Sequence, residues 1–269
     1  MPATQPIDAG LDLLACPVCS GALSRDDRVV RCPHGHSFDI ARQGQLNLLG
    51  RSSPPNADTM EMVAARARFL DSGAYGPIME TLVTACANIP GPVVEVGAGT
   101  GHYLRRLLSG REYPHLAVDV SAMAARWAAR HGLASVVADT WAGLPLRDAT
   151  VGLLACIFAP RNPSEFARIL RPGGSLVVVT PTVDHLVELR RLGGLLEITA
   201  DKLDRLDAAL GIEGIKLTQR TGVRFPLHLG CDEVADLVGM GPNAFHTART
   251  AWPALDTTAS VSISVFTRR

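Results

Sequence analysis

Three cysteines and two histidines lie close together near the start of the chain. Cys16 and Cys19 form a Cys-x-x-Cys pair, and a hairpin-like segment of twelve residues separates them from Cys32, His34 and His36. In a reducing compartment, paired cysteines at this spacing favour a metal over a disulfide. Three thiolates and one imidazole form a closed tetrahedral shell, as in structural zinc sites. We expect Cys16, Cys19, Cys32 and His36 to bind Zn²⁺, with His34 as the competing fourth ligand and a redox Cys-x-x-Cys as the alternative.

A second pattern with chemical meaning lies in the middle of the chain. Residues 93–101 read Val-Val-Glu-Val-Gly-Ala-Gly-Thr-Gly, which predicts a buried strand running into a tight turn that opens a helix. Glycine has no Cβ, so such a turn takes positive φ and approaches a ligand closely. The helix start adds free N–H groups. The spacing differs from the Gly-x-Gly-x-x-Gly of dinucleotide enzymes, and a glycine-rich turn without function or another kind of nucleotide site are the alternatives.

This stretch resembles the first motif of class I S-adenosylmethionine (SAM) methyltransferases, in which the loop cradles the methionine part of the cofactor. The resemblance implies that SAM is bound here by a run of neighbouring residues: Glu95, Gly97, Gly99, Thr100, Gly101, His102 and Tyr103.

Acids at the ends of two further predicted strands extend the site. Asp119 closes the first strand about twenty residues after the loop, where an acid reaches the ribose hydroxyls of a bound nucleotide. Asp139 closes the second strand, and in methyltransferases such an acid usually lies near the adenine, with Thr140 beside it here. Helical segments separate these strands and the apolar runs that follow. The sequence therefore predicts an α/β fold, Rossmann-like, with five strands at 93–96, 115–120, 135–139, 151–158 and 175–180.

Length and composition agree with this fold. The chain has 269 residues, of which 47% are hydrophobic, enough for a sizeable core. No segment approaches the run of about 18 apolar residues that a membrane span needs, and the start of the chain lacks a signal-peptide pattern. We therefore expect a cytoplasmic protein that does not enter a membrane. The net charge is zero, so bulk charge does not indicate a nucleic-acid binder.

The basic residues have an uneven composition. Lys202 and Lys216 are the only lysines, and every other basic residue is an arginine. Arginine suits bidentate phosphate contacts, although a GC-rich genome gives the same bias. Arg25, Arg28 and Arg31 lie on the zinc hairpin, where we expect them to contact phosphates, with a solvated charged face as the alternative.

Several segments, taken in order, resemble the RlmA-type family of large-subunit rRNA guanine-N1 methyltransferases. They are the zinc-bearing start and three later stretches, at 16–49, 58–77, 158–161 and 181–189. Residues 138–148 are most similar to the TlrB-like subgroup, which is associated with macrolide resistance. Gln45 departs from the pattern, because the family usually carries an aromatic residue after Gly44. If that aromatic residue stacks on RNA, part of the RNA contact is absent here.

The resemblance implies a function and an architecture. The function is SAM-dependent methylation of N1 of a guanosine in a hairpin of large-subunit rRNA, with macrolide resistance as a consequence. The cofactors are SAM and Zn²⁺, the partner is large-subunit rRNA, and a homodimer is left open. The expected divisions are a zinc-binding RNA-recognition domain at 1–50, a linker and helical cover at 51–90, and the methyltransferase domain at 91–269.

The chemistry of this reaction indicates where to look for catalytic residues. Guanine N1 carries a proton at neutral pH, so a base, or a group that stabilises charge on O6, would help the transfer. In open α/β sheets the place is the carboxyl end of the strands beside the cofactor crevice. Phe158 is expected to pack against the purine and Arg161 to offset negative charge, while Asp184 and His185 are the proton acceptors nearby. Alternatively, Arg161 caps a helix and His185 only packs.

The remaining segments are expected to cover the cleft. A helix is predicted from residue 58 to about 70, and a long helical segment from the fifth strand to about 210. Two or three strands follow, with a helix at 232–239 and a loop at 241–246. Two other functions remain open: a small-molecule methyltransferase of a biosynthetic pathway, and a non-catalytic RNA-binding relative. The intact glycine loop and Asp119 argue against the second.

Overall fold

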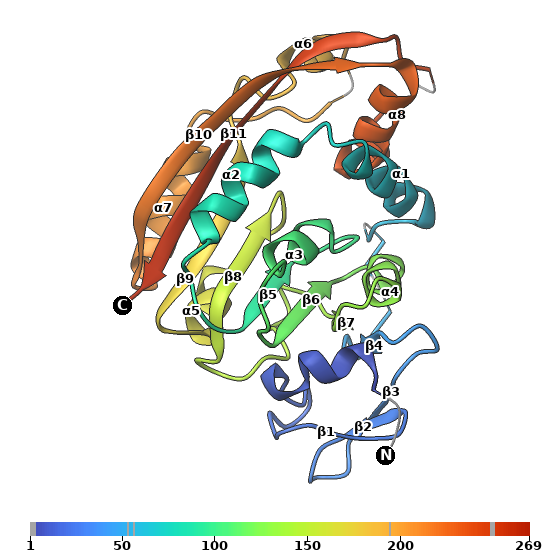
Figure 1. Cartoon of the computed structure of the whole chain (residues 1–269), viewed down its shortest axis with the longest axis vertical. Coiled ribbons are helices and arrows are strands. Elements are labelled where there is room, and N and C mark those ends of the chain that lie inside the picture. The colour runs from blue at the N-terminus through green and yellow to red at the C-terminus, as the bar shows by residue number, and fades with distance from the viewer. Residues whose placement is uncertain (1–3, 53, 56, 194, 248–250) are drawn as a thin grey trace.

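An eight-stranded mixed sheet forms the centre of the protein (Figure 1). The computed structural model describes residues 4–52, 54–55, 57–193, 195–247 and 251–269. Five parallel strands build the middle of the sheet, because their apolar residues are buried on both faces. They are β5 (Val93–Val96), β6 (His115–Asp119), β7 (Ser135–Val137), β8 (Val151–Ile157) and β9 (Leu170–Pro181). The predicted Rossmann-like α/β fold is confirmed.

The order of the strands creates a crevice beside β5. The sheet runs β10-β11-β9-β8-β5-β6-β7-β4, so β6 and β8 flank β5 on opposite sides. After β5 the chain continues to β6 on one side of it, and it later returns to form β8 on the other side of β5. In open α/β sheets, ligands bind at such a switch point, outside the carboxyl ends of the strands.

Helices cover both faces of the sheet, and alternate residues of each strand point into one of two cores. Val94 packs in the core that contains Phe166, whereas Val93 packs in the core that contains Ile78 and Leu104. The covering helices are α2 (Gly76–Cys86), α3 (His102–Leu107), α4 (Ala122–Arg130) and α5 (Pro163–Ile169), whereas α1 (Met60–Asp71) packs against α4. None of the helices in the described ranges is long and apolar enough to cross a membrane.

The N-terminal segment is attached to one edge of the sheet. Two short 3₁₀ helices are followed by a three-stranded antiparallel sheet, and β4 then pairs in parallel with β7. Ile7 and Leu14 are buried in the same core as Leu116 and Val136 of β6 and β7. The elements are η1 (Pro6–Ala9), η2 (Leu11–Leu13), β1 (Ser24–Asp26), β2 (Val29–Arg31), β3 (Ser37–Asp39) and β4 (Leu46–Asn47). We call residues 14–39 the ribbon, and its hydrophobic base is continuous with the main core.

The C-terminal part differs from the expectation in one respect. Instead of one long helix there are two, α6 (Val187–Arg191) and α7 (Lys202–Ile212), because Gly193 takes a φ of +89° shortly after α6 and the chain turns. Two strands follow, β10 (Ile215–Leu229) and β11 (Leu255–Arg268), which form a long curved antiparallel pair at the opposite edge of the sheet (Figure 1). The predicted helix between them is α8 (Cys231–Gly239), and the predicted loop at 241–246 contains η3 (Pro242–Phe245).

The hairpin arginines have different surroundings. Arg25 donates to both carboxylate oxygens of Asp8, from Nε at 2.5 Å and from Nη2 at 2.9 Å, and its side chain is 10% exposed. Arg28 donates from Nη2 to the carbonyl oxygens of Ile40 and Ala41. Arg31 remains exposed. The phosphate contact expected of Arg25 is therefore wrong, because its guanidinium holds the ribbon to η1.

This arrangement predicts unequal effects on stability. Arg25→Ala should lower the free energy of unfolding by roughly 1.5–3 kcal/mol, because it removes charged hydrogen bonds and leaves Asp8 without them. Arg31→Ala, the matched control on the same hairpin, should change it by about 0.5 kcal/mol or less. Urea unfolding of both variants measures the difference, and equal stabilities would contradict the assigned role of Arg25.

Candidate cofactor cavity and metal centre

A cavity of about 730 Å³ lies at the carboxyl ends of β5, β6 and β8. Most of the residues predicted to bind a cofactor line it: Glu95, Gly97, Gly99, His102, Tyr103, Asp119, Asp139 and Thr140. The same cavity is lined by Phe158, Arg161 and His185, the residues predicted for the reacting end. The structure therefore brings both predicted sets into one continuous space.

Thr100 and Gly101 do not line the cavity. Thr100 is 2% exposed, and a Cβ on Gly101 would lie 2.3 Å from Cδ1 of Leu133. Gly101 is thus needed where the start of α3 passes Leu133. For these two residues the structure indicates a packing role.

The other two glycines of the loop allow protein segments to approach one another. A Cβ on Gly97 would lie 2.4 Å from Cβ of Ala159, and one on Gly99 would lie 2.8 Å from Nη1 of Arg66. Both glycines have positive φ, +69° and +55°. The loop is therefore pressed between the β8–α5 turn and α1.

Asp119 fixes the position of the glycine loop through hydrogen bonds. Its Oδ2 accepts a hydrogen bond from the Gly99 N–H at 2.7 Å, and its Oδ1 accepts one from the Ser121 N–H at 2.8 Å. Burial raises the pKa of Asp119, and the two hydrogen bonds oppose that change. A buried carboxylate facing the cavity is available for two hydroxyl donors of a ligand.

Tyr103 and Arg66 contribute polar groups beside the glycine loop. The Tyr103 hydroxyl is buried and has no hydrogen-bond partner among the described residues. Arg66, from α1, bonds to the Asp58 carboxylate and donates to the Met240 carbonyl oxygen at 2.5 Å. Asp58 and Arg66 both line the cavity, although the sequence indicated only that their helix would cover it. The unpartnered hydroxyl and the acids suit the amino-acid and ribose groups of SAM.

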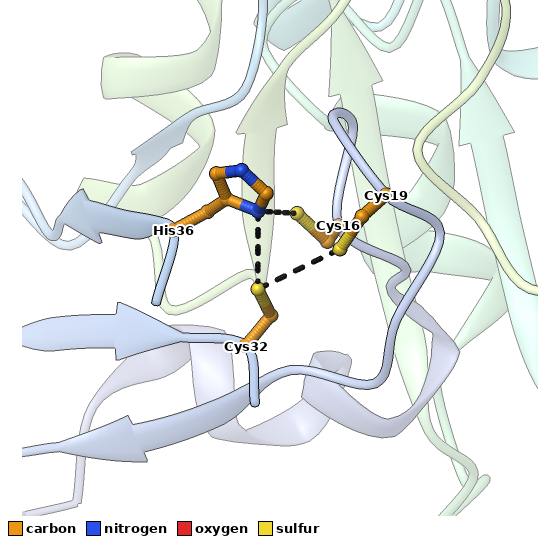
Figure 2. Close-up of side chains that lie close together, drawn as sticks. All are labelled: Cys16, Cys19, Cys32 and His36. Carbon is orange, nitrogen blue, oxygen red and sulfur yellow. Dashed lines mark hydrogen bonds between the residues drawn. The ribbon is translucent and has the colours of Figure 1, made fainter. Parts of the chain in front are cut away.

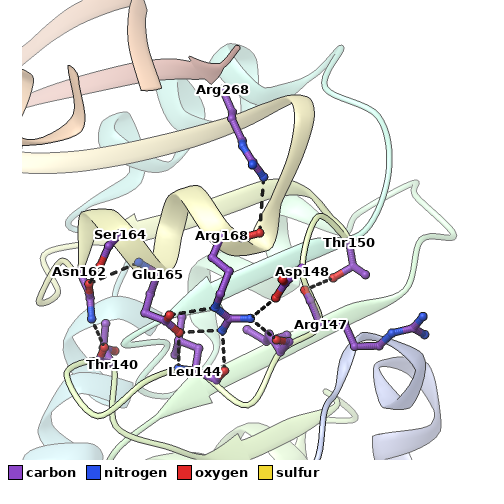
Figure 3. A network of polar contacts seen from close by, with 11 residues as sticks. Thr140, Leu144, Arg147, Asp148, Thr150, Asn162, Ser164, Glu165, Arg168 and Arg268 are labelled. Atoms are coloured by element: carbon purple, nitrogen blue, oxygen red, sulfur yellow. Dashed lines mark hydrogen bonds and ion pairs between the residues drawn. The ribbon is translucent and has the colours of Figure 1, made fainter. Parts of the chain in front are cut away.

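The wall that carries Asp139, Thr140 and Trp141 is held by helix α5. Asn162 caps this helix and donates to the Thr140 carbonyl oxygen at 2.9 Å, as Figure 3 shows. Glu165 accepts from the Leu144 N–H at 2.6 Å and pairs with Arg168, which donates to the carbonyl oxygens of Leu144 and Leu146. Trp141 lies at the rim and is 65% exposed. Because Asn162 caps the helix, the alternative that Arg161 is the cap is wrong.

Three rings gather at the reacting end. The Phe158 and His185 ring centroids are 6.0 Å apart with an interplanar angle of 26°, and Tyr75 lies 6.1 Å from Phe158. Phe158 and Leu186 both have a φ of +54°, a strained backbone region for such residues. The strained residues are thus Phe158 itself and the neighbour of His185, at the point where the two rings stack.

His185 is not placed to accept a proton. Its Nδ1 accepts a hydrogen bond from the Ser260 N–H at 3.1 Å, so the neutral ring carries its proton on Nε2, 3.4 Å from the Tyr75 hydroxyl. Burial and the charges of Arg190 and Lys202 lower the pKa of His185 to about 4. Asp184 pairs instead with Arg224 and does not line the cavity. The expectation that these two residues are the proton acceptors is wrong.

The metal-binding residues meet at the tip of the ribbon (Figure 2). Sγ of Cys16, Cys19 and Cys32 and Nδ1 of His36 lie within 4.8 Å of one another. His36 Nδ1 lies 3.3 Å from Cys32 Sγ and 3.6 Å from Cys16 Sγ, and the Sγ atoms of Cys19 and Cys32 are 3.7 Å apart. These distances are close to the edges of about 3.6–3.8 Å that a tetrahedral zinc shell requires. His34 is exposed and lies outside this cluster.

The donor set also fits zinc electrostatically. Despite burial, hydrogen bonds from the His34 and His36 backbone and the His36 ring lower the pKa of Cys32 to about 6. A thiolate is the form that binds the metal. Cys16, Cys19, Cys32 and His36 would hold a closed structural Zn²⁺, which links the turn between β2 and β3 to the segment that enters the core.

Comparison with known proteins agrees with both parts of the site. A zinc-ribbon family model described as "RlmA, N-terminal" matches residues 14–51, and one described as "Methyltransferase domain" matches residues 94–178. A 23S rRNA (guanine(748)-N(1))-methyltransferase of Streptomyces fradiae is 47% identical over 241 residues, covering 87% of this chain and 86% of that protein. A putative 23S rRNA (guanine-N(1)-)-methyltransferase of Micromonospora griseorubida is 46% identical over 258 residues, covering 87% of each.

Solved structures show the same fold at low identity. The YcgJ protein of a Bacillus covers 71% of this chain and 97% of its own, with a TM-score of 0.54 and 14% identity. A putative methyltransferase of Haloferax volcanii, in complex with the activator Trm112, covers 78% and 97%, with a TM-score of 0.51 and 17% identity. These likenesses concern the fold alone.

Removal of the metal should destabilise the whole chain, because the ribbon shares its core with the sheet. We expect one zinc per chain by elemental analysis, and a melting temperature lower by more than about 10 °C after chelation, since structural zinc contributes several kcal/mol. Cys16→Ser should lose the metal, whereas Cys231→Ser, at an exposed cysteine outside the cluster, should keep it. Metal-free protein with an unchanged melting temperature would contradict this role.

Proposed function

Because the chain belongs to the RlmA-type family of large-subunit rRNA guanine-N1 methyltransferases, we propose that it methylates N1 of a guanosine in a hairpin loop of 23S rRNA. It is a SAM-dependent methyltransferase, and SAM supplies an electrophilic methyl group when bound. The observation that carries the proposal is the single cavity that joins the cofactor loop to Phe158 and Arg161. A guanosine there would lie beside the cofactor, as in-line transfer requires.

The proposed roles at the cofactor end follow from the side chains that face the cavity. Asp119 would accept from the ribose hydroxyls, and Asp139 and Thr140 would border the adenine. Glu95, Tyr103 and His102 would surround the methionine part. Gly97 and Gly99 would let the loop approach the cofactor as closely as it approaches Ala159 and Arg66.

The proposed roles at the reacting end rest on the three rings and Arg161. Phe158 is 39% exposed and offers a flat face for a purine, since unpaired RNA bases stack on aromatic side chains. His185 and Tyr75 would close the other side, with the His185 Nε2–H as a donor. Arg161 lines the cavity and donates from Nη2 to the buried Thr180 Oγ1 at 3.0 Å, which fixes its guanidinium.

Recognition of the RNA around the target is assigned to two exposed features. Trp141 at the rim would stack on a neighbouring base. The ribbon with exposed Arg31, and exposed Arg42 just after it, would contact the backbone of the hairpin. One feature typical of the family differs here, since Gln45 stands where an aromatic residue is usual. Its side-chain oxygen is buried without a partner among the described residues.

Further proposals concern which guanosine is methylated, what its methylation causes and where the enzyme acts. The Streptomyces fradiae relative is named for guanine 748, and at 47% identity we take the same guanosine as the target. Methylation there would confer macrolide resistance, which drug susceptibility of a host expressing the chain measures. The enzyme would act in the cytoplasm, where its rRNA substrate is found.

A small-molecule methyltransferase is the rival that a simple experiment separates. Transfer of labelled methyl groups from SAM to unmodified 23S rRNA, and RNA binding that weakens steeply with salt because phosphate contacts release counterions, are the expected results. Labelling of small metabolites without labelling of rRNA would refute the proposal.

Asp119 provides a direct test of the cofactor site. Asp119→Ala should weaken SAM binding by about 10–150-fold, the equivalent of roughly 1.5–3 kcal/mol of charged hydrogen bonds. Asp256→Ala, at an exposed aspartate outside the cavity, should bind SAM normally. Titration calorimetry measures both, and unchanged binding in the Asp119 variant would remove this residue from the site.

Glu95 should give cofactor binding a pH dependence. Burial raises its pKa to about 8, so the free site holds a neutral carboxylic acid at neutral pH. The positive charges of a bound cofactor stabilise the carboxylate, so the pKa falls in the complex and binding releases a proton. Affinity should therefore rise by up to about tenfold per pH unit towards pH 8 and then level. Calorimetry with Glu95→Gln, which keeps an acceptor for the Leu104 N–H, should show a flatter profile; identical profiles would contradict the assignment.

A further inference from the structure

Methyl transfer to guanine N1 requires that the N1 proton leaves. The new N1–carbon bond forms as the carbon–sulfur bond of the sulfonium breaks, the electron pair of that bond goes to sulfur, and the N1 proton goes to water. As the proton leaves, negative charge develops on N1 and O6 of the base. Groups that stabilise this charge inside the cavity accelerate the step.

The carboxylates that line the cavity within the described ranges are already engaged. Each accepts hydrogen bonds from, or pairs with, a neighbour in the protein: Glu95 with Leu104, Asp119 with Gly99 and Ser121, Asp58 with Arg66, Asp139 with Arg51, and Glu197 with Arg190. His185 uses its only lone pair on Ser260. Within the described ranges, each carboxylate and the imidazole that line the cavity thus have a protein partner, and we take charge stabilisation as the route.

Lys202 is the first residue of α7 and lines this end of the cavity. It is half-buried, and the described residues offer it no hydrogen-bond or ion-pair partner. Only one other lysine, Lys216, occurs in the chain. An ammonium that lies in a cavity without a partner is available to a ligand.

The groups that face Lys202 are mainly cationic. Burial and the charges of Arg161 and Arg205 lower its pKa, and its own charge acts on His185. Arg205, on the same helix, pairs with Asp201, and Arg190 of α6 pairs with Glu197. Arg161 and Lys202 are thus two positive charges that line the cavity, close enough for the charge of Arg161 to act on Lys202.

Arg161 contributes its charge there. Its Nη2 bonds to Thr180, while its Nε is covered by protein and has no partner among the described residues. The guanidinium is therefore fixed beside the cavity, and its positive charge acts on an anion bound there. The Lys202 ammonium is the group that can donate to such an anion.

We propose that Lys202 is a catalytic residue of the methyl transfer, which donates to O6 of the target guanine and, with the charge of Arg161, stabilises the anion left when the N1 proton goes to water. This inference rests on the proposed function, since it requires guanine as the substrate. A positive charge beside O6 favours the deprotonated base, so the fraction of reactive guanine at neutral pH increases.

The test compares three variants of the full-length protein in single-turnover methylation of unmodified 23S rRNA, between about pH 6 and pH 9.5. Lys202→Met should slow the step about 10²–10³-fold at neutral pH. The deficit should shrink as pH rises, because hydroxide then removes the N1 proton without help. Lys202→Arg should restore most of the rate, since it keeps the charge, and Lys216→Met should match the wild type.

Two further readouts separate catalysis from other roles. RNA affinity, measured by fluorescence anisotropy without cofactor, should change less than about twofold in Lys202→Met, and its melting temperature should stay near that of the wild type. A rate deficit that is equal at every pH, or a loss of RNA affinity with an unchanged rate at saturating RNA, would overturn the role of Lys202. Absence of rRNA methylation by the wild-type protein would refute the proposed function itself, and the inference with it.

Discussion

The site depends on one buried carboxylate beneath the glycine loop. Asp119 accepts hydrogen bonds from the N–H groups of Gly99 and Ser121, and so fixes the end of β6 to the loop that follows β5. The loop is also pressed against Ala159, where any Cβ on Gly97 would collide. These contacts join three neighbouring strands at their carboxyl ends. The cavity has its shape because none of the three can move independently.

The ribbon is part of this arrangement rather than an appendage. Cys16 is both a metal-binding residue and a member of the main core, where it packs with Leu14 and Leu146. β4 then extends the sheet beside β7, the strand that precedes Asp139. Zinc bound by the ribbon therefore stabilises the surface of the ribbon, which is connected to the cavity through the core and the sheet. An enzyme that must hold an RNA hairpin and a cofactor at a fixed separation benefits from such a connection.

Much of this could be predicted from the sequence, because the signals are local. β-branched runs, alternating glycines and strand-end acids predicted the sheet and the cofactor end, and Cys-x-x-Cys spacing predicted the metal-binding residues. What failed depends on tertiary contacts. The hydrogen bond from Ser260 to His185 joins residues 75 positions apart, and Asp8 neutralises Arg25 from a separate element. Lys202 lies in no motif, and Trp141 belongs to a stretch that indicated a subgroup but no position, so only the fold places these two residues on the cavity.

The central claim is that N1 of a guanosine in 23S rRNA receives the methyl group. Mass spectrometry of nucleosides from rRNA treated with the protein and SAM, with primer extension to locate the product, tests it most directly. We expect N1-methylguanosine at one hairpin position, where the methyl group blocks base pairing and stops the extending strand. Methylation at another atom or another base, with N1-methylguanosine absent, would contradict the account.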